Sequence, residues 1–163
     1  MRDAQSTGNR DDADDRHAID DWLTAYLSTR RKATEVYSAA DAAGYSKDQA
    51  KKAHETLIAT YLAENVDDRI ERRTRNGGKD RGDLSGIRLS PALGGGRVVA
   101  ELKNTAKIAL SSWQAEAEIE RGNDNTAVAL VIHKRHGVGD PGRQWVTCTV
   151  DDQDHLLARV LAT

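Results

Sequence analysis

Two carboxylates and a lysine near the middle of the chain have the residue types and the spacing of a cation-binding site. Asp83 follows Gly82, and Glu101 and Lys103 are two residues apart in the alternating run RVVAELK. Side chains two residues apart in a strand point to the same face, about 7 Å from each other at roughly 3.3 Å of rise per residue. If a strand that carries Asp83 pairs beside this run, two carboxylates and an ammonium converge at one end of a sheet.

Such a group could bind a hard divalent cation. Mg²⁺, with Mn²⁺ as the alternative ion, prefers oxygen ligands, so Asp83, Glu101 and the backbone carbonyl of Leu102 would form part of its shell. A bound cation lowers the pKa of a water and neutralises charge on a phosphate, while Lys103 can hold the attacking water. These residues therefore suit phosphodiester hydrolysis. The alternative interpretation is a solvated ion pair, because Glu-x-Lys is common on the exposed face of a strand.

A basic strip precedes this group and indicates a polyanionic partner. The strip contains two acids, Glu71 and Asp80, and six cations: Arg69, Arg72, Arg73, Arg75, Lys79 and Arg81. Such a strip could contact the phosphate backbone of DNA, although scattered charge on a solvated hairpin is the other interpretation. Further along, Lys134 and Arg135 follow an apolar run and could hold phosphates at the end of that strand.

The composition bounds the fold and the location of the protein. The 163 residues carry a formal net charge of -2, and with 4% aromatic residues and no Phe the core must consist of Val, Leu, Ile and Ala. The single cysteine, Cys148, excludes an intrachain disulfide and fits a reducing compartment. Neither a signal-peptide pattern nor a window approaching roughly eighteen apolar residues is found. These features predict a soluble, cytoplasmic protein without a membrane partner.

The N-terminal part is predicted to be a disordered leader followed by helices. Residues 1–16 hold five aspartates and almost nothing apolar, so we expect no ordered structure there. The apolar spacing predicts helices from His17 to Arg30 and from Ala33 to Ala43, and Gly44 stops the second.

A third, longer helix is predicted to begin after Ser46, which serves as its N-cap. Residues 17–45 then form a helical extension, and residues 46–163 form the main domain. The extension has two interpretations. It is either a helix-turn-helix that presents the lysines at positions 47, 51 and 52 to DNA, or an ordinary pair of packed helices.

The rest of the chain alternates between strands and helices. Asn76-Gly77-Gly78 predicts a turn, and three strands follow: Arg97 to Lys103 with one wet face, Thr126 to Ile132 covered on both faces, and Gln144 to Val150. We expect a helix from Ile108 to Arg121 that Asn123 ends in a left-handed conformation. Asp151 or Asp152 can cap a last helix that reaches about Leu161. From the third helix onward the order is α, β, β, β, α, β, β, α, which predicts an α/β fold with a mixed sheet flanked by helices.

Four blocks in this region resemble a known nuclease family. They are IERRTRNGGKDRGDLSGI, VVAELKN, SSWQAEAEIERGN and VIHKRHGVGDPGRQWVTCT, and they cover about half of the chain, from Asp68 to Thr149. Their order and spacing resemble the PD-(D/E)XK nuclease superfamily, and within it the Holliday junction resolvase-like proteins of bacteriophages. The resemblance implies a restriction-endonuclease-like fold for residues 46–163. It also implies that Asp83, Glu101 and Lys103 bind magnesium and activate water.

The resemblance also suggests roles for two helix glutamates, and the sequence departs from the family motif in two places. Junction-resolving relatives carry a glutamate in the first helix, and Glu55 matches it best; the alternative is an exposed helix acid. Glu116 could support Lys103 or the second shell of the metal, or could be a surface acid. The proline that names the motif is replaced by Gly82, and the insertion SPALGGG lengthens the loop between the motifs.

Taken together, these patterns predict a magnesium-dependent DNA endonuclease. The resemblance implies branched DNA, such as a Holliday junction, as the substrate, and a homodimer that makes two symmetric cuts in the cytoplasm, the host's if the protein is phage-encoded. The alternative from another class is a non-catalytic DNA-binding protein that assists replication or recombination with the same fold.

Overall fold

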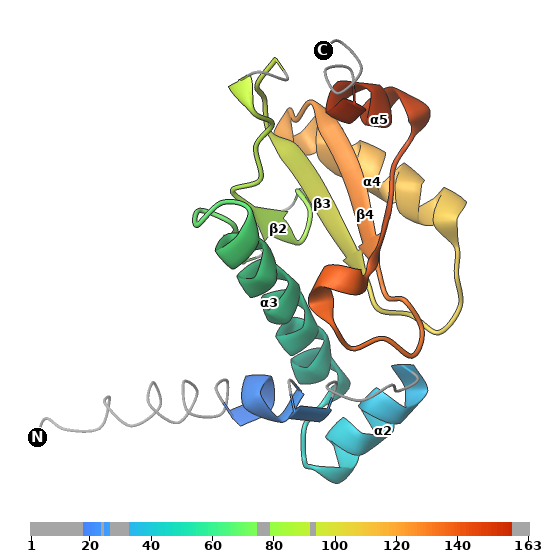
Figure 1. The fold of residues 1–163 in the computed structure, drawn as a ribbon. Helices are drawn as coiled ribbons and strands as arrows, with labels where there is room; N and C mark the ends of the chain where they lie inside the picture. The colour runs from blue at the N-terminus through green and yellow to red at the C-terminus, as the bar shows by residue number, and fades with distance from the viewer. Residues whose placement is uncertain (1–17, 24, 27–32, 75–78, 92–93, 158–163) are drawn as a thin grey trace, which may run out of the picture.

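A computed structural model describes residues 18–23, 25–26, 33–74, 79–91 and 94–157 (Figure 1). Several predicted features lie outside these residues: the leader 1–16, the turn at 76–78, the side chain of Arg75 and the end of the last helix beyond residue 157. None of the helices in the described ranges is long and apolar enough to cross a membrane.

The centre of the molecule is a mixed sheet of five strands in the order β1-β2-β3-β4-β5. The strands are β1 (Glu71–Arg72), β2 (Leu84–Ser85), β3 (Val98–Lys103), β4 (Val128–His133) and β5 (Trp145–Thr147). Only β3 and β4 are parallel; the other neighbours are antiparallel. With α3 (Lys47–Asn65), α4 (Leu110–Asp124) and α5 (Val150–Leu157), the predicted order α, β, β, β, α, β, β, α is confirmed, as is the mixed α/β sheet.

Both faces of the central strands are covered by helices. On one face, Ile58 and Ala59 of α3 pack against Leu84, Ala100 and Leu102 of the sheet. On the other face, which we call the α4 face, α4 contributes two residues, Trp113 and Ala117, to a cluster with Val99 and Val131. The prediction that β4 is buried on both sides is confirmed.

The prediction that one face of β3 is exposed to solvent is wrong. Val99 is fully buried and Glu101 is buried too, because α4 packs over the face that carries them. The alternation of apolar and charged residues does indicate two different faces, but the charged face is turned toward a helix and not toward solvent. The acidic residue on this strand therefore lies in the interior.

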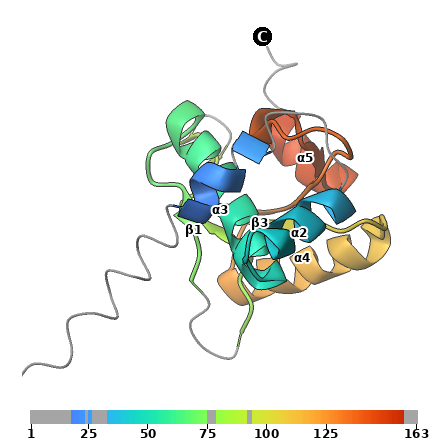
Figure 2. The ribbon, with the colours of Figure 1, turned by 90° about the horizontal axis from the view of Figure 1, so that it is seen from below.

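Helix α3 links the N-terminal helices to the sheet. Its N-cap is Ser46, whose side chain accepts a hydrogen bond from the backbone of Gln49 while the Gln49 side chain accepts one from the backbone of Ser46, which confirms the predicted start. The preceding helix, α2, runs from Ala33 to Ala42, close to its predicted range, and Gly44 follows with φ +88°. In Figure 2, α2 and the helical residues 18–23 and 25–26 lie beside one end of α3, where Ile19 and Leu23 are buried against Ala53.

Three predicted boundaries are corrected. Helix α4 runs on to Asp124, and Asn125, not Asn123, takes the left-handed conformation with φ 49°, while the Asn123 side chain donates to the backbone carbonyl of Asp80. Helix α5 begins at Val150, because Thr149 Oγ1 accepts from the backbone N–H of Asp152 and the Asp152 carboxylate bonds back to Thr149. Strand β5 ends at Thr147, since the chain then turns into this cap.

Candidate functional site

Asp83, Glu101 and Lys103 meet where β2 lies beside β3. The backbone N–H of Asp83 donates to the carbonyl of Ala100 at 3.0 Å, which continues the β2–β3 pairing and sets Asp83 beside Glu101. The carboxylate of Asp83 accepts from the backbone N–H of Leu102 at 2.9 Å. Asp83 and Glu101 are both buried, so the carboxylates meet in a place largely shielded from water.

Glycine is required at position 82, where the chain approaches β3. Its φ is +82°, and a Cβ built on it would lie 2.5 Å from Val99 Cγ2 and 3.0 Å from the carbonyl oxygen of Ala100. Proline, which names the family motif, has a ring that fixes φ near -65°, so it could not adopt this backbone conformation. The departure from the motif therefore has a physical reason: the chain approaches β3 too closely for any side chain.

Lys103 is held by two glutamates on the α4 face. Its ammonium donates to Glu101 Oε1 at 2.7 Å and also forms an ion pair with Glu116 of α4. Burial lowers the pKa of Lys103, but the two carboxylates outweigh this effect and the net pKa is raised. Glu116 therefore lies in contact with Lys103, although its carboxylate is half exposed.

Glu55 brings a further acid from α3 to the same region. It is buried, which corrects the alternative interpretation of an exposed helix glutamate. Burial and the negative charge of Asp83 raise its pKa, while Lys51 and Arg72 lower it. Both cations lie close, with Lys51 Nζ 3.5 Å from Oε1 and Arg72 Nη1 3.7 Å from Oε2.

Glu120 is the acid that was not named as a site residue in the sequence. It lies on α4 one turn after Glu116 and is 5% exposed. Burial and the negative charges of Glu101 and Asp80 raise its pKa to about 8. The signal in the sequence is a glutamate at the three-and-four spacing that begins with the buried Trp113 and Ala117, since a charge in such a stripe points inward.

We call Glu55, Asp83, Glu101 and Glu120 the carboxylate cluster. Burial and the charge of Asp83 raise the pKa of Glu101 to about 7, even though Lys103 lowers it. Within the described ranges, no hydrogen-bond donor reaches Oε2 of Glu101 or Oε2 of Glu120, and both atoms are buried. Acidic oxygens that are buried without donors are what a bound cation would satisfy.

The cluster fits a hard cation held by few protein ligands. Asp83 and Glu101 supply two carboxylates. In a strand, the N–H and the C=O of one residue point to the same neighbouring strand. Because the Leu102 N–H bonds to Asp83, the Leu102 carbonyl also points toward β2, the side on which Asp83 lies. No group of three or more His, Cys, Asp or Glu in the described residues is arranged to enclose a metal ion. Mg²⁺ does not need such a cage, because one or two carboxylates with waters usually hold it.

Three arginines of the predicted basic strip form ion pairs with acids of the same chain. Arg69 pairs with Asp67, Arg72 with Glu55, and Arg73 with Asp124 at 3.0 Å. Lys79 and Arg81 are exposed, and Arg75 lies outside the described residues. In the first turns of α3, Lys47 and Lys52 are exposed, whereas Lys51 pairs with Glu55.

The two cations after β4 lie in different surroundings. Lys134 is 4% exposed, its pKa is lowered by burial, and its ammonium has no hydrogen-bond partner within the described residues. A contact with DNA would require it to move. Arg135 is half-buried and its guanidinium lies 4.8 Å from the centre of the Trp145 ring, so it is the better placed of the two for a phosphate.

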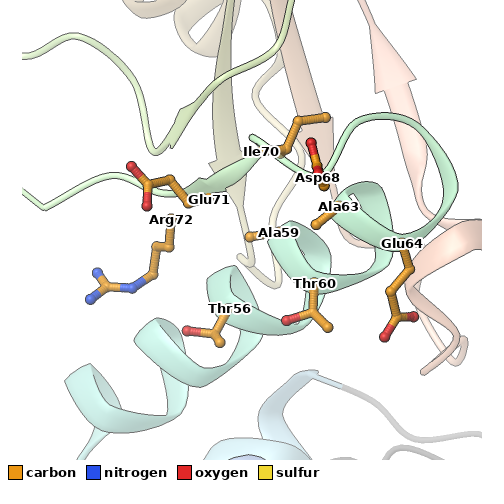
Figure 3. Close-up of a pocket in the computed structure, with 9 residues that line it drawn as sticks. All are labelled: Thr56, Ala59, Thr60, Ala63, Glu64, Asp68, Ile70, Glu71 and Arg72. Atoms are coloured by element: carbon orange, nitrogen blue, oxygen red, sulfur yellow. The ribbon is translucent and has the colours of Figure 1, made fainter.

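A separate hollow of about 440 Å³ lies between α3 and β1 (Figure 3). Ala59, Ala63 and Ile70 give it an apolar lining, and three acids and one arginine also line it: Glu64, Asp68, Glu71 and Arg72. Three carboxylates against one guanidinium would repel a phosphodiester. The hollow is therefore a poor site for DNA. It is connected to the carboxylate cluster through Arg72, which lines the hollow and pairs with Glu55.

No protein-family model, curated protein or solved structure matches this chain. The likeness to PD-(D/E)XK nucleases therefore rests on the motif residues themselves and on their meeting between β2 and β3.

Proposed function

We propose that the chain is a magnesium-dependent endonuclease that hydrolyses phosphodiester bonds of DNA, with a restriction-endonuclease-like fold. One observation carries the proposal: Asp83 lies in a different sequence block from Glu101 and Lys103, yet the three meet between β2 and β3, where both carboxylates are buried. A solvated ion pair, the alternative, would not be buried between a strand and a helix. Mixed strand pairing with α3 and α4 on opposite faces supports the fold part of the proposal.

Asp83, Glu101 and the carbonyl of Leu102 would hold the cation. When bound, Mg²⁺ supplies a Lewis acid that lowers the pKa of a water and neutralises charge on a phosphate. Two observations support a cation here: Glu101 Oε2 is buried without a hydrogen-bond donor among the described residues, and the Leu102 N–H holds the Asp83 carboxylate beside β3. The protein contributes a prearranged pair of negative charges, which binds a divalent ion more readily than a monovalent one.

Lys103 would act on the reacting phosphate as a fixed donor. Its ammonium is held between Glu101 and Glu116, so its position is set before substrate arrives. From there it can orient the attacking water or stabilise the charge that develops on the phosphate oxygens. Glu116 is a positioning residue in this scheme, because its carboxylate pairs with Lys103 and would act through that ammonium.

Glu55 and Arg72 would border the site on the α3 side. Arg72 is within 3.7 Å of Glu55, and a phosphate that approached the cluster could take over this guanidinium as a partner. Glu55 would then be free to hold a cation or a water near Asp83. The exposed Lys79 and Arg81, which precede Asp83 in the chain, could guide the flanking backbone.

The preference for branched DNA and the homodimer come from the family resemblance. A four-way junction needs two symmetric cuts, which two copies of one site supply. The runner-up function is a DNA-binding accessory protein of replication or recombination, which would share the basic residues but not the cleavage.

A cleavage assay on a four-way junction and on matched duplex DNA, with Mg²⁺ and with EDTA, tests the proposal. We expect cutting only with Mg²⁺ and a loss of about 100-fold or more in Asp83→Asn and Glu101→Gln, as for removal of other charged catalytic groups. The control is Asp151→Asn, at an exposed position in the first turn of α5. DNA binding without cutting by the wild type would favour the accessory protein, and full activity of Asp83→Asn would exclude this cation site.

A further inference from the structure

A row of three side chains crosses the sheet from the candidate site to the last strand. Lys103 of β3 is the register partner of His133 of β4, and His133 is the register partner of Trp145 of β5. Register partners point to the same face of a sheet. This is the α4 face, since the centre of the His133 ring lies 5.5 Å from that of Trp113 of α4. Neighbouring strands are about 4.8 Å apart, so the row is about 10 Å long.

Trp145 is the exposed end of this row. Strand β5 comes last in the sheet order, so one of its sides has no neighbouring strand among the described residues. Trp145 is 52% exposed, whereas His133 is buried and Lys103 is half-buried. Helix α4 thus covers the row as far as His133 and leaves the indole open to solvent.

The surroundings of Trp145 are arranged before any ligand arrives. The guanidinium of Arg135 lies 4.8 Å from the centre of its ring, a contact in which cation and aromatic face attract each other. Gln144 fixes this pair. Its Oε1 accepts from the backbone N–H of Arg135 at 2.9 Å, and its Nε2 donates to the carbonyls of Val138 and Asp140. An aromatic ring and a cation held together at an exposed strand suit a nucleotide, because the ring can stack on a base while the cation pairs with a phosphate.

We propose that Trp145 and Arg135 form a stacking site for an unpaired base of the DNA strand whose phosphate Lys103 contacts. The inference rests on the proposed function, which places the reacting phosphate at Lys103. The row of about 10 Å corresponds to roughly three base steps of 3.4 Å, so the stacked base lies a few nucleotides from the cut. Taking a base out of a duplex costs pairing and stacking energy, so the site favours DNA in which a base is already unpaired.

Binding without cleavage tests the stacking site. The probes are a duplex with one unpaired fluorescent adenine analogue and the same duplex fully paired. Ca²⁺ replaces Mg²⁺, because it also takes oxygen ligands but forms a looser shell than the octahedral one of Mg²⁺. We expect the wild type to bind the first probe about tenfold more tightly and to quench its fluorescence, as stacking of one base on an aromatic ring predicts.

Variants of the edge strand assign this preference to the indole. Trp145→Ala should lose the preference and the quenching, whereas Trp145→Phe, which keeps an aromatic face, should retain most of both. Val146→Ala is the matched control, since Val146 is 59% exposed on the same strand and points to the opposite face. Circular dichroism reports the fold of each variant, and the quenching in the wild type needs no variant at all.

The outcomes separate the stacking site from the proposed function. Equal affinity of the wild type for the two probes, or an unchanged preference in Trp145→Ala, overturns the inference. An unchanged preference with a lower sedimenting mass in Trp145→Ala would also overturn it and make β5 a contact between two copies of the chain. Cleavage with Mg²⁺ but no preference would overturn only the stacking site. A preference that Trp145→Ala abolishes, without cleavage in Mg²⁺, would support the stacking site and favour the accessory protein over the endonuclease.

Discussion

At the scale of single residues, the close approach of Gly82 to β3 makes this position sensitive to one added methyl group. We expect Gly82→Ala to lower the free energy of unfolding by about 1–3 kcal/mol, because the residue has a positive φ and its Cβ would press on Val99 and on the backbone of Ala100. Urea denaturation measures the change. Gly122→Ala is the control: it lies within α4 with nothing within 4 Å of its Cβ position, so it should be neutral or stabilising. Equal effects of the two changes would contradict the strained position of Gly82.

His54 predicts a pH dependence of stability. Burial and then the charge of Lys134 lower its pKa from 6.5 to about 4. Between these values the unfolded chain binds a proton at His54 that the folded chain does not, so this contribution is complete above pH 6.5. It is lost as the pH falls to 4, by about 3 kcal/mol.

The measurement compares denaturation of the wild type and of His54→Gln across this range. Glu101 and Glu120 act in the opposite sense, because their raised pKa values favour the folded state at low pH and cost stability as the pH rises toward 7 and 8. The difference between the two proteins isolates His54 and should change only between pH 4 and 6.5. His155→Gln, at an exposed position of α5, should track the wild type. A constant difference would contradict the shifted pKa.

At the scale of elements, periodicity and cap residues predicted most of the fold. The start of α3 followed from Ser46, and the buried strand β4 followed from its apolar run. The surroundings of β3 could not be predicted in the same way, because alternation distinguishes two faces but does not say what covers each one. The alternation therefore predicted an exposed Glu101, whereas α4 packs on this face and buries it.

The candidate site was predictable where its residues share one strand or one hairpin. Asp83, Glu101 and Lys103 form such a group, and β2–β3 pairing brings them together. Glu120 could not be identified as readily, since its contact with Glu101 depends on how α4 lies across the sheet. The ion pairs of the basic strip could not be predicted from the sequence for the same reason. Arg73, for example, meets Asp124 because of how α4 packs on the sheet.

At the scale of the whole molecule, Lys79 and Arg81 are the exposed cations among the described residues of the basic strip. Within the described residues no ion pair holds Lys79 or Arg81, whereas Arg69, Arg72 and Arg73 are each paired. We expect the double variant Lys79→Ala and Arg81→Ala to reduce the slope of log affinity against log salt by about 1.8, at 0.9 for each lost phosphate contact on duplex DNA. Binding at several salt concentrations gives the slope. Arg143→Ala, exposed on the short helical turn Pro141–Arg143, serves as a control, and an unchanged slope in the double variant would remove these two residues from the interface.

The helical extension is predicted to act as a support for α3, and through α3 for Glu55. Ile19 and Leu23 are buried against Ala53, with Trp22 and Leu57 packed at the edge of the cluster, so the apolar stripe of the first helix is covered within the chain. We expect Leu23→Ala to cost about 2–5 kcal/mol of unfolding free energy, while Leu110→Ala, at a residue 42% exposed, costs far less. Thermal denaturation measures both, and sedimentation should show the same mass for Leu23→Ala as for the wild type below its melting temperature. A lower mass with unchanged stability would instead make the first helix a contact between two copies of the chain, because the truncated side chain would then separate the copies without loosening the fold of either one.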